Sequence, residues 1–182
     1  TFSQSDSFVS LLTHNTTNKV VSMFGAEQLQ FDDATASLTT TGSGEFLVNT
    51  TTTSYQLHPD ITALESGGFV ITWQSKYQDG DNYGVYAQRY DADGDRASNE
   101  FQVNTYTAND QNFSSITALA GGGFVITWQS KYQDGSSDGI YAQRYDADGS
   151  VNGTEFKVNT YTSSNQQYPS TTALSDGGFV IT

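Results

Sequence analysis

The sequence predicts an all-β protein built from tandem copies of one 55-residue unit. The first observation is repetition: residues 67–80 recur letter for letter at 122–135, and a third copy runs from 177 to 182. The second is composition, with 17 Gly, 11 Tyr and 11 Phe but one Met and no Cys. That balance is typical of short strands joined by tight turns. The period therefore decides the expected architecture.

The units are expected to follow a leader, or a set of degenerate strands, at residues 1–27. The repeat domain covers residues 28–182 and comprises a partial unit at 28–55, full units at 56–110 and 111–165, and a partial unit at 166–182. The last unit stops before the Trp-Gln-Ser that continues both earlier copies, which suggests a processed or truncated protein.

Four antiparallel strands are expected in each unit because β-forming runs alternate with turn residues. In the first full unit they cover residues 61–64, 69–75, 85–90 and 101–105. Gly-Gly joins the first two strands and Asp-Ala-Asp-Gly follows the third. The Asp-Ala-Asp-Gly segment is interpreted as a hairpin turn rather than a cation site, because EF-hand spacing is missing.

The second strand carries apolar residues on both faces, with Phe69, Ile71 and Trp73 on one and Val70 on the other. Such a strand is expected in a sheet that lies between two others. Four strands in about 55 residues is typical of a β-propeller blade. Because the chain holds too few units for a complete propeller, a three-fold β-prism or trefoil-like fold stays open as the alternative. Strands at 28–31 and 46–50 would complete the partial C-terminal unit and close the ring.

The repeated phrases Gly-Gly-Phe-Val-Ile-Thr-Trp-Gln-Ser, Tyr-Ala-Gln-Arg-Tyr-Asp-Ala-Asp-Gly and Glu-Phe-x-Val-Asn-Thr carry a family resemblance. Residues 28–182 look like the repeats of very large bacterial secreted or surface proteins, in the repeats-in-toxin adhesin and haemolysin-type calcium-binding group. The resemblance implies an extracellular or cell-surface location and a role in adhesion. The Gly-Gly-x-Gly-x-Asp nonapeptide of that group is absent, so its calcium-filled β-roll is not implied.

The charge narrows the classes of partner. Twenty acidic and 7 basic residues give a formal net charge of −13, which repels nucleic acid and anionic membrane surfaces and attracts divalent cations. No apolar run is long enough for membrane insertion. Partners are therefore expected among cell-surface glycans or proteins, neighbouring repeats, or other copies of the chain.

The loop after the second strand holds the predicted site residues. Asp79 and Asp81, with Asp134 and Asp138 in the next copy, are candidate ligands for Ca²⁺, which prefers oxygen ligands on flexible loops. The alternative is that Asp-Gly only shapes the turn. The candidate ligand-binding residues in the same loops are Tyr77, Gln78, Tyr132 and Gln133. Trp73 and Trp128 are expected in the core.

Arg89 and Arg144 interrupt strands that look buried, and we expect them to pair with Glu100 and Glu155. Catalysis is not expected, because the two histidines do not recur, Cys is absent and no Ser has a nucleophile-elbow context. The sequence thus predicts a non-catalytic adhesion or scaffolding module. An accessory domain of a secreted polysaccharide-active enzyme and a subunit of a surface filament or coat are the alternatives.

Overall fold

The structure is a computed structural model of the 182-residue chain. It describes residues 46–182 in full and the backbone of four short strands at 10–13, 20–23, 28–30 and 35–37. The chain divides into two compact units, Thr1–Phe46 and Leu47–Thr182. All regular structure in the described residues is β and antiparallel, which confirms the all-β prediction. No helix that could span a membrane occurs in this part of the chain.

In the first compact unit, the described residues form two pairs of short antiparallel strands. Strand β1 (Ser10–Thr13) pairs with β2 (Val20–Met23), and β3 (Gln28–Gln30) pairs with β4 (Thr35–Ser37). The strand expected at 28–31 is thus present as β3, while Phe31 lies outside the described residues.

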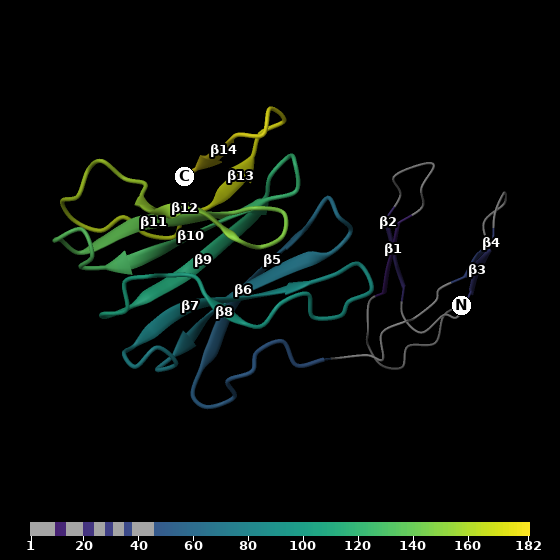
Figure 1. Cartoon of the computed structure of the whole chain (residues 1–182), viewed down its shortest axis with the longest axis horizontal. Helices are drawn as coiled ribbons and strands as arrows, with labels where there is room; N and C mark the ends of the chain where they lie inside the picture. Colours follow the sequence, from purple (N-terminus) through teal and green to yellow (C-terminus); the bar gives the residue numbers. More distant parts are fainter. Residues whose placement is uncertain (1–9, 14–19, 24–27, 31–34, 38–45) are drawn as a thin grey trace. The chain divides into compact units, whose positions relative to one another are not determined.

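The second unit contains two four-stranded sheets and one two-stranded hairpin (Figure 1). Within each sheet, consecutive strands are neighbours, and neither sheet closes on itself. The first sheet consists of β5 (Gln56–Ala63), β6 (Phe69–Lys76), β7 (Tyr83–Tyr90) and β8 (Phe101–Gln102). The second consists of β9 (Gln111–Ala118), β10 (Phe124–Lys131), β11 (Asp138–Tyr145) and β12 (Val151–Lys157). The hairpin consists of β13 (Thr171–Ala173) and β14 (Phe179–Ile181).

The pairing register is the same in the two sheets. Phe69 faces Tyr90 across β6 and β7, and Phe124 faces Tyr145 across β10 and β11. The first strand of each sheet is interrupted by a bulge, opposite which the register shifts. Asp91 begins the hairpin turn after β7: its side chain accepts hydrogen bonds from the amides of Asp93 and Asp95, while Gly94 has a φ of 85°. This agrees with the turn interpretation.

The fourth strand is where the sequence-based prediction was wrong. Residues 46–50 form no strand, and β8 ends at Gln102 instead of continuing to residue 105. Residues 46–50 are held by hydrogen bonds to side chains instead of by backbone pairing with a strand. The Glu100 carboxylate accepts the amide of Thr50 at 2.6 Å, and Arg96 donates to the carbonyls of Leu47 and Val48 at 3.0 Å.

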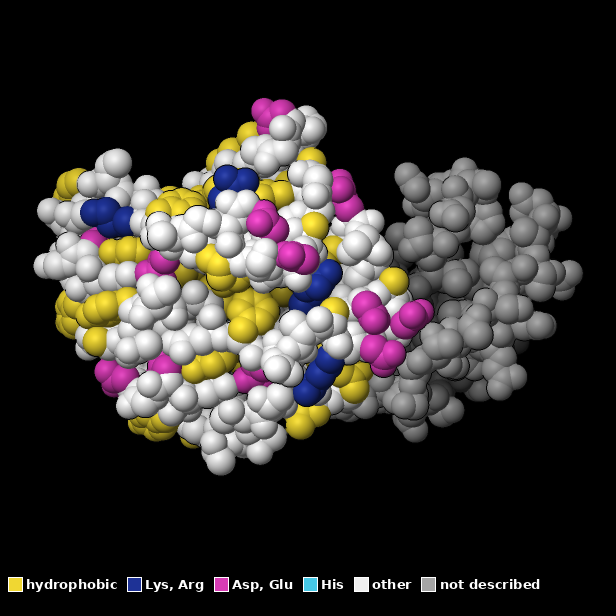
Figure 2. Space-filling model, viewed as in Figure 1, with side chains coloured by type: hydrophobic (Ala, Val, Ile, Leu, Met, Phe, Trp, Pro, Cys, Tyr) yellow, Lys and Arg dark blue, Asp and Glu magenta, His cyan; other side chains and the backbone are white. Residues whose placement is uncertain are grey.

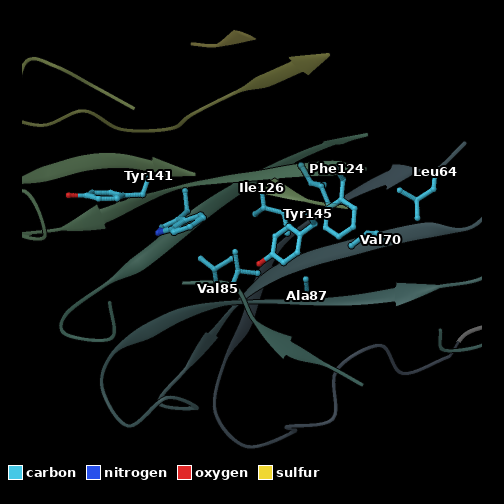
Figure 3. Packing of buried hydrophobic residues seen from close by; sticks show 11 residues of the cluster. Leu64, Val70, Val85, Ala87, Phe124, Ile126, Tyr141 and Tyr145 are labelled. Carbon is cyan, nitrogen blue, oxygen red and sulfur yellow. The ribbon is translucent and has the colours of Figure 1, made fainter. Parts of the chain in front are cut away.

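The core lies between the two sheets (Figure 3). Val70 of β6, Val85 of β7 and Leu64, which follows β5, belong to one buried cluster with Phe124 and Ile126 of the second sheet. Both faces of the second strand are apolar, as expected, and the tryptophans are confirmed as core residues with 3% and 0% exposure for Trp73 and Trp128. Within the second sheet, the rings of Phe124 and Tyr145 stack with centroids 4.8 Å apart, and Tyr145 also meets Phe101 of the first sheet at 5.4 Å between centroids.

The opposite face of the second sheet packs on the C-terminal hairpin. Leu119, Val125 and Ala142 are buried, and Phe179 and Ile181 pack against them. Strand β9 contacts both β5 and β13, so the first strands of the three sheets lie side by side (Figure 1).

Polar side chains connect these neighbouring first strands. The Asp60 carboxylate accepts the amide of Ile116 at 2.9 Å, and the Thr62 hydroxyl accepts the amide of Ala118 at 3.1 Å. One sheet further on, the Ser115 hydroxyl accepts the amide of Thr171 at 3.3 Å. Because outward-facing amides of β9 and β13 would otherwise lack partners, these bonds specify which sheet follows which.

Candidate functional site

The loops after β6 and β10 present one exposed tyrosine each. Tyr77 is 58% exposed and Tyr132 is 54% exposed, so both candidate rings lie at the surface, and their role in binding stays a prediction. Each ring lies near a lysine ammonium, with Lys76 Nζ 4.8 Å from the Tyr77 centroid and Lys131 Nζ 5.5 Å from the Tyr132 centroid. The side chains are therefore held at the surface without being buried.

The backbone of both loops holds the tyrosine in a left-handed conformation. The φ angles are 66° at Tyr77 and 63° at Tyr132, a region that bulky side chains seldom occupy. The Tyr77 amide donates to the carbonyl of Asn82 and the Tyr132 amide to that of Ser137, both at 2.6 Å. A strained conformation that recurs without burial of the side chain is typical of a functional position.

Gln78 and Gln133 point inward and do not join the exposed rings. Gln78 Nε2 donates to Glu100 Oε1, and Gln133 Nε2 donates to Glu155 Oε1, both at 2.5 Å. The other oxygen of Glu155 accepts the amide and hydroxyl of Thr105, at 2.7 and 3.0 Å. These glutamines therefore tie each loop to the fourth strand, while their own Oε1 atoms are buried without a hydrogen-bond partner.

In each sheet, the glutamate that binds the glutamine lies near a buried tyrosine, together with an aspartate of the loop. Burial, and after it the negative charges of Asp79 and Glu100, raise the pKa of Tyr86 to about 12. Asp79 Oδ2 also adjoins Gly84, where an added Cβ would lie 2.5 Å from it. Tyr141 repeats this arrangement with Asp134 and Glu155, again with a pKa of about 12 caused first by burial.

The predicted metal ligands do not all lie beside the buried tyrosines Tyr86 and Tyr141. Asp79 and Asp81 share a loop, and the Asp81 amide donates to Asp79 Oδ1 at 3.3 Å. Asp81 Oδ2 accepts the amide of Asn109 at 2.9 Å. Asp138 is the first residue of β11 and accepts Gln167 Nε2 at 2.6 Å. Within the described residues, no three His, Asp or Glu side chains come together as a metal site. A calcium role of these loops stays a prediction.

The predicted arginine–glutamate pairs do not form. Arg89 Nη1 donates instead to the carbonyl of Asp148, at 3.0 Å, in the turn of the next sheet. The Arg144 guanidinium lies 5.8 Å from the ring centroid of Phe179 in the C-terminal hairpin. Both arginines thus contact the following sheet, whereas Glu100 and Glu155 are occupied by glutamine and threonine donors.

Sequence reasoning missed a second aromatic feature, the aromatic row, which consists of His58, Phe113 and Tyr168. All three have positive φ angles, of 51°, 53° and 57°, and they are spaced 55 residues apart. The ring of Phe113 lies 4.8 Å from His58 and 4.7 Å from Tyr168, measured between centroids. The sequence does carry a signal for this feature, because an aromatic ring recurs at the same position of each copy, although the residue type differs.

The aromatic row lines an open depression with a volume of about 330 Å³. Pro59, Asp60, Ser114, Ser115 and Pro169 complete its lining. The amide of Phe113 donates to Gln74 Oε1 at 3.2 Å, and the amide of Tyr168 donates to Gln129 Oε1 at 3.3 Å. Each sheet therefore positions the ring of the sheet that follows it. Aromatic faces beside hydroxyl and carboxylate groups are suited to ligands with both apolar and polar faces.

Acidic side chains outnumber basic ones on the face of the protein drawn in Figure 2, in keeping with the formal net charge of −13. Comparison of the chain with protein-family models, curated proteins and solved structures found no match. Function must therefore be inferred from the residues themselves.

Proposed function

We propose that the chain is a non-catalytic extracellular binding module, active in adhesion or scaffolding, that contacts cell-surface glycans or proteins through repeated aromatic residues. The observation that carries this proposal is the pair Tyr77 and Tyr132. Both rings are more than half exposed and both residues have a φ near 65°, although neither gains burial from the strained backbone. Tyrosine is favoured at contact surfaces because it offers a large apolar ring and a hydroxyl at low entropic cost.

A propeller-like arrangement is the architecture we propose for this module. Support comes from the sequential strand order within each sheet and from the side-by-side first strands β5, β9 and β13. Adjacent blades of a propeller contact each other in this way. A β-prism or trefoil-like fold is less favoured, because both faces of the second sheet are covered by neighbouring sheets.

The non-catalytic part of the proposal rests on repetition. The carboxylates near Tyr86 recur near Tyr141, whereas an enzyme normally assembles one asymmetric site. The resemblance to secreted bacterial repeat proteins supports the extracellular location. Roles as an accessory domain of a polysaccharide-active enzyme or as a filament subunit are the alternatives, and neither requires chemistry within this chain.

The binding proposal is tested with fluorescently labelled chain on a glycan array and on intact bacterial and animal cells. The double variant Tyr77→Ser/Tyr132→Ser is expected to lose binding, and Tyr161→Ser, which alters another tyrosine with 68% exposure, is the matched control. Periodate treatment of the cells abolishes binding to a glycan, and protease treatment abolishes binding to a protein. Unchanged binding by the double variant would refute the assigned contact residues, and no binding on any surface would refute the function.

Calcium stabilisation is a separate part of the proposal. The carboxylates of Asp79 and Glu100 lie near Tyr86, and Gln78, which donates to Glu100, has a buried Oε1 without a hydrogen-bond partner; oxygen ligands of this kind suit Ca²⁺. A ligand that binds only the folded state raises the melting temperature. Millimolar CaCl₂ is expected to raise the melting temperature of the wild type but not that of Asp79→Asn/Asp134→Asn, with MgCl₂ as the control. No shift in the wild type would remove calcium from the proposal and leave the binding role intact.

A further inference from the structure

The ammonium group of Lys76 lies among three tyrosine rings. Its Nζ atom is 4.8 Å from the ring centroid of Tyr77, 5.5 Å from that of Tyr83 and 5.7 Å from that of Tyr55. All three distances are within the roughly 6 Å over which a cation is attracted to the face of an aromatic ring. The rings of Tyr55, Tyr77 and Tyr83 therefore form an aromatic cage, and a lysine of the same chain occupies it.

Backbone contacts fix this arrangement on three neighbouring segments. Lys76 is the last residue of β6 and faces Tyr83, the first residue of β7. On the other side, the Lys76 amide donates to the carbonyl of Tyr55 at 2.9 Å. Successive side chains of a strand point to opposite faces, and the left-handed φ of 66° at Tyr77 breaks that alternation. The Tyr77 ring consequently approaches the same ammonium group as the other two rings.

The second sheet shows that the fold does not require this cage. Lys131 also ends its strand, and its amide donates to the carbonyl of Asp110 at 2.9 Å. Asp110 and Asp138 occupy the positions that Tyr55 and Tyr83 hold 55 residues earlier. Lys131 Nζ accordingly lies 3.8 Å from Asp110 Oδ2, and one of the three rings is retained in this copy. Three rings around one lysine thus distinguish the first of the two four-stranded sheets, as a ligand site would.

We propose that the aromatic cage binds a quaternary ammonium group, such as that of choline, which displaces the Lys76 side chain. Ring faces attract a quaternary ammonium, and the primary ammonium of lysine is the more strongly hydrated cation, so the exchange returns the lysine to water. The rings of Tyr55 and Tyr77 are more than half exposed, so the exchange needs no change of the backbone. The formal net charge of −13 favours a cationic ligand over an anionic one.

An NMR titration of the full chain with choline chloride tests this proposal. Dimethylbutanol, the neutral isostere in which carbon replaces the charged nitrogen, is the matched ligand. Choline is expected to bind with a dissociation constant of about 1 mM, and dimethylbutanol about tenfold more weakly or less. Tyr55→Ala should weaken choline binding about two- to fivefold, whereas Tyr55→Phe, which keeps the ring, should retain it. Tyr132→Ala is the control and should bind choline like the wild type. Circular dichroism verifies that the variants are folded.

The inference rests on the proposed function in one respect, because Tyr77 is a contact residue in both. The two fail separately: Tyr55→Ala retains Tyr77 and Tyr132 and should still bind glycans that carry no quaternary ammonium. Phosphocholine identifies the source of the cation. Tighter binding of phosphocholine than of choline would assign the cage to a phosphorylated headgroup, and weaker binding would assign it to an unphosphorylated quaternary ammonium.

Replacement of the resident lysine tests the displacement itself. Lys76→Met keeps the length of the side chain and removes the competing charge, so it should tighten choline binding, whereas Lys131→Met should leave it unchanged. The proposal would be overturned by a wild type that does not bind choline at concentrations up to about 20 mM, by equal binding of dimethylbutanol, or by unchanged affinity of Tyr55→Ala. Binding that occurs in Lys76→Met alone would also overturn it, because the lysine would then exclude the ligand.

Discussion

Valine occupies one position in three successive units, at Val70, Val125 and Val180, and this provides a direct test of how the sheets pack. The first two side chains are 0% exposed between sheets, and the third is 45% exposed. Replacement by alanine removes the equivalent of two methylene groups. At a buried position this costs about 1.6 kcal/mol in transfer free energy and, with the cavity included, about 2–3 kcal/mol of unfolding free energy.

At Val180 the same change removes surface that is already half in water and leaves no enclosed cavity. The expected loss is therefore about 0.5–1 kcal/mol. Urea denaturation at 25 °C, followed by circular dichroism at low protein concentration, measures all three variants. The comparison is valid where the dependence of unfolding free energy on urea is unchanged. Equal losses at the three positions, or the largest loss at Val180, would refute the assignment of buried and exposed faces.

Three further predictions concern the links between and within the sheets. Glu155→Gln should lower the unfolding free energy by about 1–2 kcal/mol in urea denaturation, because Glu155 accepts charge-assisted bonds from Thr105; an unchanged midpoint would count against this link. Gly68→Ala should lower the melting temperature far more than Gly178→Ala, because an added Cβ at Gly68 overlaps the Tyr90 carbonyl, whereas at Gly178 its nearest atom is Asp176 Oδ1 at 3.1 Å; similar effects would contradict this packing. Burial raises the pKa of Tyr86 and Tyr141 from 10.0 to about 12, so their contribution to stability should be complete below pH 10 and lost as the pH rises from 10 to 12. A pH titration followed by tyrosinate absorbance, comparing Tyr86→Phe with the wild type, checks this prediction. If the group missing from the variant titrates near pH 10, the raised pKa of Tyr86 is contradicted.

The central hairpins were predictable because their residues combine two local signals. Residues 69–75 alternate two apolar faces and follow Gly67, whose φ of 91° only glycine adopts readily. Strand β5 is longer than expected, since it begins at Gln56 and includes His58 and Pro59 around a bulge. Those residues do not resemble a strand, and only the pairing with β6 makes them one.

The incorrect predictions concern contacts that cross from one 55-residue repeat to another. Arg89 and Glu100 are close in sequence, but Glu100 bonds to Thr50 and Arg89 to Asp148 of the following sheet. Partners about 50 residues away cannot be chosen from local spacing. The aromatic row was missed for a different reason. His58 looked isolated in the sequence, because the property that recurs is an aromatic ring rather than one residue type.

Stoichiometry of binding tests the repeated tyrosine sites most directly. Isothermal titration calorimetry with a monovalent saccharide that binds on the glycan array is expected to give two equivalent sites per chain, one at Tyr77 and one at Tyr132. Tyr77→Ser should reduce the stoichiometry to one site with unchanged affinity at the other, and Tyr161→Ser should leave both sites intact. A single site in the wild type, or two sites in Tyr77→Ser, would contradict binding through repeated tyrosines.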